Sequence, residues 1–171
     1  HQVNCQGVMG SGIAKQIREK WPIVYNKYRS LYIDQCNNTQ NLLGKCQLID
    51  INDSQSVANL FGQQYYGRDG KRYTSYDAIY NALTDLAVQM MDNGMESLAF
   101  PYKMSSDRGG ADWNVVLAMI ESVFKDTDVT IEIWSLTEIP ELKKKCSNKS
   151  NNSSTRGAGN SCSVCTLHCR H

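Results

Sequence analysis

The sequence has no long apolar run and no excess of charge of one sign. No stretch approaches the roughly 20 apolar residues that span a bilayer, so no transmembrane helix is predicted. The 171 residues carry 18 basic and 17 acidic side chains, a formal net charge of +1. Such a balance gives no global electrostatic argument for a nucleic acid or an anionic membrane as partner. A secretory signal pattern is also missing, so a cytoplasmic location is expected.

Acidic residues are absent from residues 143–171, which hold six basic residues, four of the seven cysteines and no aromatic residue. A segment of this composition cannot bury enough apolar area to offset its conformational entropy. We therefore predict a folded domain over residues 1–140 and a disordered basic tail, rich in Cys, Ser and Asn, over residues 141–171. Residues 1–142 carry 12 basic and 17 acidic side chains, a net charge of −5.

Paired cysteine spacing is missing from the folded part, where Cys5, Cys36 and Cys46 stand apart, so reduced thiols are expected. The tail contains Cys162-x-x-Cys165-x-x-His168-Cys169, whose residue types are those of zinc ligands. Four ligands within eight residues, with no strand or helix to support them, instead favour free thiols on a flexible tail. No metal and no cofactor are predicted.

The chain alternates between strand-like and helical segments. Strands are predicted at residues 1–5, 47–51, 57–63, 97–102 and 129–136, and helices at about residues 11–20, from Pro22 onward, and at about 74–94 and 112–124. Ser75 and Asp112 lie at expected helix starts and can act as caps. The order of these elements predicts an α/β fold, a three-layer α/β/α sandwich with a mixed central sheet.

A glycine-rich segment, residues 7–13, lies between the first strand and the first helix. Glycines allow positive φ and a close approach of the backbone to a ligand. The helix start adds unpaired N–H groups and a positive dipole end, so a phosphate group fits this turn. The same residues also fit a tight turn that binds nothing, and they match neither the Walker nor the dinucleotide pattern.

A second loop, residues 101–113, also follows a strand and precedes a helix. In an open α/β sheet the loops at the carboxyl ends of the strands share one crevice, so two loops of this kind can hold two phosphates. Asp107 and Arg108 are its candidate polar groups. Alternatively, Asp107 is a turn residue and Arg108 a solvated charge.

The two loops resemble those of macrodomains. Residues 1–14 are similar to the first ligand loop of that family and residues 101–113 to the second, and the resemblance extends over about residues 1–136. It points to the branch with terminal ADP-ribose protein glycohydrolase, DNA de-ADP-ribosylating antitoxins and ADP-ribose-1″-phosphate phosphatase, of which phages and bacteria carry stand-alone members. The resemblance implies an ADP-ribose cleft in an α/β/α fold.

The resemblance also implies roles for single residues. Asn4 falls where the family places a polar side chain against the distal ribose, although it also fits a strand-end residue that bonds to its own backbone. The implied ligand-binding residues are Gly7, Val8, Met9, Gly10, Ser11, Gly12 and Ile13 in the first loop, and Ser105, Ser106, Arg108, Gly109 and Gly110 in the second. Asp107 is the candidate general base, and Asn4 would orient the ribose.

The chain departs from the family pattern in three ways. The family's opening strand and its adenine-recognising acidic residue are expected before His1, so the first strand is missing from this chain. Where relatives have Gly-Cys-Gly in the second loop, this chain has Ser105-Ser106-Asp107. Glycohydrolase-type members use a Lys after the strand at 57–63 and an Asp in the second loop. Here the strand continues into glutamines, with no Lys before Lys71, and the Asp position corresponds roughly to Gly109. A lysine-dependent covalent mechanism is therefore not expected.

Three functional hypotheses remain. The first is an enzyme that hydrolyses ADP-ribose-1″-phosphate or an ADP-ribosyl conjugate. The second is a non-catalytic module that binds ADP-ribose, and the third is a generic binder of nucleotide phosphates. The expected partner is ADP-ribose or an ADP-ribosylated substrate, with no membrane, and with nucleic acid only as an ADP-ribosylated substrate.

Overall fold

The structure, a computed structural model, describes residues 1–35, 38–135 and 166–169, and of the last range only the backbone. Every helix and strand predicted from the sequence is present. The elements in chain order are β1 (Gln2–Asn4), α1 (Gly12–Lys20), α2 (Pro22–Asp34), the 3-10 helix η1 (Thr39–Leu42), β2 (Cys46–Asn52), β3 (Gln55–Gln63), α3 (Tyr76–Asp92), β4 (Ser97–Pro101), α4 (Trp113–Phe124), β5 (Thr130–Ser135) and β6 (Thr166–Cys169).

The strands form two three-stranded sheets. In the first, with the order β1-β3-β2, β1 runs parallel and β2 antiparallel to β3, and Val3 lies opposite Phe61. In the second, with the order β4-β5-β6, all strands are parallel, and Phe100 lies opposite Ile133. The predicted α/β class with mixed pairing is confirmed, but its hydrogen bonding is divided between two sheets.

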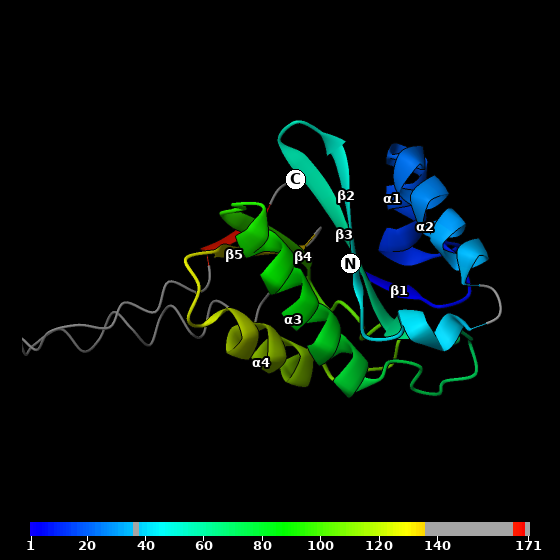
Figure 1. Cartoon of the computed structure of the whole chain (residues 1–171). Coiled ribbons are helices and arrows are strands. Elements are labelled where there is room, and N and C mark those ends of the chain that lie inside the picture. Colours follow the sequence, from blue (N-terminus) through cyan, green and yellow to red (C-terminus); the bar gives the residue numbers. More distant parts are fainter. Residues whose placement is uncertain (36–37, 136–165, 170–171) are drawn as a thin grey trace, which may run out of the picture.

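Helices cover both faces of β3. Successive side chains of a strand point to opposite faces, so neighbouring residues of β3 pack against different helices. Phe61 packs with Tyr28 and Val24 of α2 in one core cluster. Its neighbour Leu60 packs on the other face in a second cluster, which includes Ile79 of α3 and residues of α4, β4 and β5. In Figure 1, α1 and α2 lie on one side of β3, and α3 and α4 on the other. These are the three expected layers.

Local sequence signals set the helix starts. Ser75 accepts a hydrogen bond from the Ala78 N–H at the start of α3, and Asp112 accepts one from the Asn114 N–H at the start of α4. Both bonds satisfy backbone donors that the first helical turn leaves open. Pro22 occupies the first position of α2, where its missing N–H has no cost.

The structure contains one strand that the sequence analysis did not predict. β6 runs parallel to β5, with Glu132 opposite Thr166 and Ser135 opposite Cys169. Main-chain pairing along an open strand edge needs no apolar side chains, so the composition of the segment gave no signal for it. The rest of the predicted tail, the expected boundary at residue 140, and Cys162 and Cys165 lie outside the described residues.

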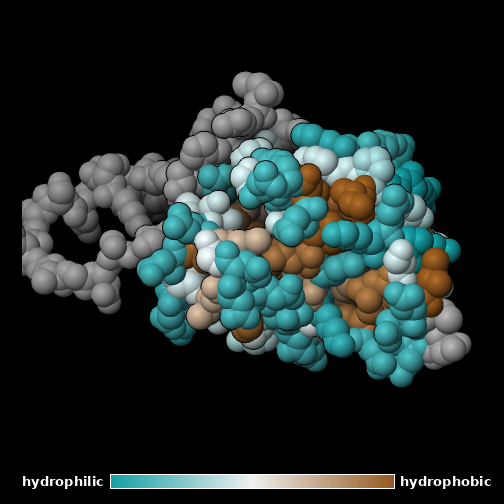
Figure 2. All heavy atoms as spheres, turned by 45° about the horizontal axis from the view of Figure 1, so that its top comes forward, coloured by the Kyte–Doolittle hydropathy of each residue, from teal (hydrophilic) through white to brown (hydrophobic). Residues whose placement is uncertain are grey.

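The expectations on a membrane-spanning helix and on a metal site can be compared with the described part of the chain. No helix there is long and apolar enough to cross a membrane. Within the same residues, no three His, Cys, Asp or Glu side chains come together as a metal site. Hydrophobic residues on the face drawn in Figure 2 gather in separate patches between larger hydrophilic areas.

Gly62 provides a test of how closely α3 packs on the sheet. A Cβ there would overlap Ile79 Cδ1 of α3 and lie 2.6 Å from Gln2 Oε1. Gly62→Ala should therefore lower the free energy of unfolding by about 1–3 kcal/mol, as overpacking does. Urea denaturation measures this change.

A double-mutant cycle identifies the cause. Ile79→Val removes the overlapping Cδ1 and should cost about 0.5–1.5 kcal/mol in the wild-type background. In the Gly62→Ala background the same substitution should cost clearly less. Strictly additive free energies would mean that the two side chains do not compete for the same space.

Candidate functional site

The loops that follow β1, β3 and β4 enclose one cleft of about 500 Å³. The two loops singled out from the sequence therefore share a crevice, as the rule for open α/β sheets predicts. The predicted site residues that line the cleft are Asn4, Val8, Gly10, Ser11, Gly12, Ile13, Ser105, Asp107, Arg108 and Gly109. The volume lies within the range typical of small-molecule sites.

The N-terminus of α1 opens into this cleft. Ser11 is the N-cap residue, with extended backbone angles, but its side chain makes no capping hydrogen bond, and the first turn has no acidic residue. The starts of α3 and α4 are capped by their own side chains. The N–H groups and positive dipole end of α1 are thus left for an anion in the cleft.

The two glycines of this turn, Gly10 and Gly12, have different roles. Gly12 has φ +57°, a conformation that other residues rarely adopt. Gly10 has no such strain, and the nearest atom to a Cβ built there would be Val8 Cγ1 at 3.6 Å. The protein itself would therefore accept a side chain at residue 10. Any such side chain takes space from the cleft, which Gly10 lines.

The side chain of Asn4 organises the first loop from within. Its Oδ1 accepts hydrogen bonds from the Gln6 N–H (2.9 Å) and the Val8 N–H (3.3 Å), and its Nδ2 donates to the Val8 carbonyl (2.7 Å). The Tyr28 hydroxyl lies 2.6 Å from the Asn4 carbonyl oxygen and 2.9 Å from Oδ1. Burial raises the pKa of Tyr28 well above its usual range, so this hydroxyl stays a donor.

These contacts agree with the alternative interpretation of Asn4 as a strand-end residue that bonds to nearby backbone. The residue is only 7% exposed, yet it lines the cleft. Its role toward a ligand stays a prediction, and its role in holding residues 4–8 follows from the geometry.

The second loop is held in a strained conformation. Lys103 (φ 57°) and Ser105 (φ 69°) lie in the left-handed region, which costs a residue with a side chain about 1 kcal/mol. The Ser105 carbonyl accepts hydrogen bonds from the Ala111 N–H (3.0 Å) and the Thr74 hydroxyl (3.2 Å). The Ser105 hydroxyl is buried and has no hydrogen-bond partner within the described residues.

A partly buried polar network links this loop to β1 and β3. Gln2 Nε2 donates to Gln63 Oε1 and to Thr74 Oγ1 (3.0 Å), and Thr74 in turn donates to the Ser105 carbonyl. The N–H groups of Tyr73 and Thr74 both donate to the Gly109 carbonyl. A Cβ at residue 109 would overlap Thr74 Oγ1 and the Ser105 carbonyl, so the network requires glycine there.

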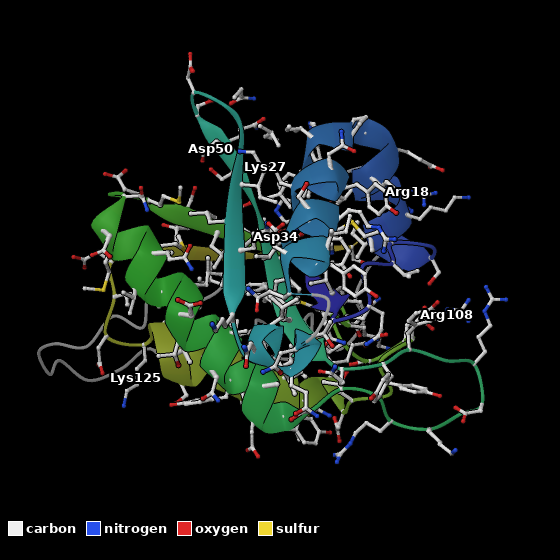
Figure 3. The ribbon with its side chains drawn as sticks, turned by 45° about the vertical axis from the view of Figure 1, so that its right-hand side comes forward. Arg18, Lys27, Asp34, Asp50, Arg108 and Lys125 are labelled. Carbon is white, nitrogen blue, oxygen red and sulfur yellow. The ribbon has the colours of Figure 1, made fainter. Side chains whose placement is uncertain are left out.

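The charged pair of the second loop lies in solvent. The Asp107 and Arg108 side chains are 83% and 57% exposed, and Arg108 Nε lies 3.8 Å from Asp107 Oδ2. An exposed pair of this kind contributes about 1 kcal/mol or less. Both groups line the cleft, and Figure 3 shows Arg108 on the side of the long loop that follows β3. Both are therefore free to reorient toward a ligand.

Four predicted ligand-binding residues do not line the cleft. Met9 is 1% exposed and packs in the core that covers Phe61. Gly7 (φ 68°) and Gly110 (φ 69°) allow tight turns. Gly7 lies close against Arg29 and Tyr32, and Gly110 lies close against Arg72. The Ser106 hydroxyl contacts the Met104 carbonyl (3.4 Å). In this structure these residues shape the loops and do not contribute to the cleft surface.

Sequence reasoning missed several residues that line the cleft, chiefly Gln2, Gln63, Arg68 and Lys103. One signal was available, because a period of two places Gln2 on the same face of β1 as Asn4. Arg68 belongs to a loop that composition alone marks as solvent-exposed, and nothing local brings it to this cleft.

The described cysteines of the folded part are not suited to nucleophilic chemistry. Cys5 and Cys46 are free and buried. Burial raises the pKa of each thiol to about 12. Both thus remain protonated near neutral pH, and the thiolate is the reactive form.

Comparison with known proteins agrees with the fold. The family model of the Macro domain matches residues 1–120. A DNA ADP-ribosyl glycohydrolase of Mycobacterium tuberculosis is 28% identical over 134 residues, which are 75% of this chain and 36% of the relative. The chain thus spans little more than a third of the length of the curated relatives that it matches first.

Two solved structures superpose well. The macrodomain of Mycobacterium tuberculosis DarG gives a TM-score of 0.66 at 25% identity, covering 80% of this chain and 87% of that one. Thermosipho africanus DarTG in complex with ADP-ribose gives a TM-score of 0.65 at 21% identity, covering 84% and 39%. Because its identity is only 21%, the similarity to the Thermosipho africanus protein concerns the fold alone.

Asn4→Ala tests the structural role of this side chain. The substitution removes an acceptor shared by three donors and leaves the Val8 carbonyl without its partner, so it should lower the free energy of unfolding by about 2–3 kcal/mol. Urea denaturation measures the loss. The control is Ser11→Ala, which alters the same cleft but breaks no capping bond and should stay within about 0.5 kcal/mol of wild type. Equal stability of both variants would contradict the interpretation of Asn4 as the centre of the loop.

Proposed function

The chain belongs to the macrodomain family, and from that membership we propose that the cleft binds ADP-ribose. One observation carries the proposal: the uncapped N-terminus of α1 and the strained second loop line the same cleft of about 500 Å³. A diphosphate placed between them meets the N–H groups of Gly12 and Ile13 from one side. Lys103 and Arg108 supply positive charge from the other.

We further propose that the bound ADP-ribosyl group is hydrolysed from a nucleic-acid conjugate. The relative from Mycobacterium tuberculosis is named DNA ADP-ribosyl glycohydrolase, and this name supports the substrate class. In the reaction a water oxygen bonds to C1″ of the distal ribose while the bond to the linked group breaks. The water gives one proton to a base, and the leaving group takes up a proton from solvent.

Asp107 is the proposed base. It lines the cleft, and its only polar contact within the described residues is the weak pair with Arg108, so its carboxylate is available to accept a proton. Attack by water, and not by a lysine side chain, also fits the positions of the lysines in the chain. Among the described residues Lys103 is the only lysine that lines the cleft, and it comes from the second loop and not from the segment after β3.

A second candidate function is binding without turnover. The bonds that Asn4 makes within its own loop and the 83% exposure of Asp107 favour it, since neither side chain is held in place toward a substrate. The phosphatase reaction on ADP-ribose-1″-phosphate is the third. It would need the same diphosphate site, with water attacking phosphorus.

Calorimetry and turnover separate these candidates. ADP-ribose should bind more tightly than ADP or AMP, because the cleft has polar groups for the distal ribose as well as the diphosphate. Equal affinities for ADP and ADP-ribose would indicate a generic binder of nucleotide phosphates. An ADP-ribosylated single-stranded oligonucleotide should release free ADP-ribose faster than ADP-ribose-1″-phosphate releases phosphate. Binding of ADP-ribose with no turnover of either substrate would support the second candidate function, a non-catalytic binding module.

Gly10→Val tests the diphosphate loop. The fold should survive, since no protein atom lies closer than 3.6 Å to the new Cβ. The added methyl groups fill the approach to the α1 N-terminus, so ADP-ribose binding should fall below detection in calorimetry. Gly10→Ala, which adds one carbon atom, should lose less affinity. Unchanged affinity in a folded Gly10→Val protein would remove this loop from the site.

Asp107→Asn tests the base. The amide keeps the size of the side chain but cannot accept the proton, so turnover of the oligonucleotide conjugate should fall about 100-fold or more. ADP-ribose affinity should be kept or improved, because a negative charge near the diphosphate is removed. Hydrolysis at the wild-type rate by the folded variant would exclude Asp107 as the base.

A further inference from the structure

The mouth of the cleft has a different charge from the rest of the domain. We define the cleft rim as residues 65–73 and 102–111, the loops that follow β3 and β4. The rim holds five basic and two acidic residues, whereas the rest of the described residues up to residue 135 holds seven basic and thirteen acidic ones. An anionic polymer is thus attracted to the rim and repelled by the body of the domain.

The two loops of the rim form one continuous surface. The Gly109 carbonyl accepts the N–H groups of Tyr73 and Thr74, and the backbone of Gly110 lies against that of Lys71 and Arg72. Arg68, Lys103 and Arg108 all line the cleft itself. Positive charge therefore continues from inside the cleft onto the surface outside it.

The loop after β3 is ordered by its own contacts. The Tyr73 hydroxyl donates to Asp69 Oδ1 (2.8 Å), and Lys71 Nζ lies 3.1 Å from Asp69 Oδ2. Gly67 packs so closely on the Tyr73 ring that a Cβ there would overlap it. This fold of the loop holds Tyr65 and Tyr66 outward, 61% and 55% exposed.

Exposed tyrosines beside cations are typical of surfaces that bind single-stranded nucleic acid. Of the four tyrosines in the rim, Tyr65 and Tyr66 are exposed. Unpaired bases stack on such rings whatever their sequence, and the cations contact the phosphates. Arg68 makes no ion pair or cation–π contact within the described residues, so its guanidinium is available for a phosphate. An acidic peptide would use the cations but offers no planar groups for the rings.

We infer that the cleft rim binds the nucleic-acid strand that carries the ADP-ribosyl group. Bases next to the modified nucleotide stack on Tyr65 and Tyr66, and Arg68 and Lys71 contact the adjoining phosphates. The strand is single, because bases within a duplex are already stacked on each other and cannot reach the rings. The inference rests on the proposed function and adds a second subsite outside the ADP-ribose cleft.

The double variant Tyr65→Ala/Lys71→Gln tests the rim, because neither residue lines the cleft. Fluorescence anisotropy measures affinity for an unmodified single-stranded oligonucleotide and for the same strand carrying ADP-ribose, and calorimetry measures affinity for free ADP-ribose. The variant should lose about 10-fold or more in affinity for both strands, as loss of one stacked base and one phosphate contact predicts. Its affinity for free ADP-ribose should be unchanged.

Tyr80→Ala/Lys125→Gln is the matched control. Tyr80 is 43% exposed on α3, and Lys125 is paired with Asp126 at 3.7 Å, much as Lys71 is paired with Asp69. Figure 3 shows Lys125 on the opposite side of the molecule from Arg108. This variant removes the same chemical groups elsewhere, so its affinity for all three ligands should equal that of wild type.

Two results would overturn the inference: equal affinity of wild type and the rim variant for the unmodified strand, or tighter binding of an acidic peptide than of that strand. Wild-type affinity for the strand should also fall as salt rises, with a slope that is smaller in the rim variant. Failure of wild type to bind free ADP-ribose would contradict the proposed function instead. The anisotropy measurement with the unmodified oligonucleotide, which needs no ADP-ribose, still decides whether the rim binds nucleic acid.

Discussion

The hydrogen bonds that join the partly buried Gln2 to Gln63 and Thr74, and the buried bond from Thr74 to the Ser105 carbonyl, hold the parts of the cleft together. They connect β1 and β3 to the second loop, which lies far from both strands in the sequence. A buried polar group left without a partner costs about 1–3 kcal/mol, and the buried bond from Thr74 to the Ser105 carbonyl forms only when the loop takes its native course. That requirement offsets the cost of the left-handed residues Lys103 and Ser105.

The charges of the site follow from this arrangement. With the second loop fixed, the uncapped end of α1 and the side chains of Lys103 and Arg108 line the same cleft. The acidic side chains of the domain lie mostly elsewhere, so an anionic ligand is drawn toward this one opening. In our proposals the cleft binds the ADP-ribosyl group and the rim binds the strand that carries it, so affinity and substrate class depend on different residues.

The division of the sheet was not predictable from local pattern. In β4 and β5 more buried residues alternate with more exposed ones, and β3 is buried on both faces as a central strand should be. Which strands exchange hydrogen bonds depends on packing across the whole domain. β6 is a further case, since its pairing with β5 uses main-chain groups that every sequence has.

The sequence by itself determined the order of helices and strands, the caps at Ser75 and Asp112, and the two glycine-containing loops, because these depend on neighbours within a few residues. It also contained the family resemblance that the match over residues 1–120 confirms. Only the tertiary structure decided that Asn4 bonds to Tyr28 and that Tyr66 and Arg68 border the cleft. Those contacts join residues far apart in the chain. Periodicity and composition describe one segment at a time and are the same whether or not two distant segments meet.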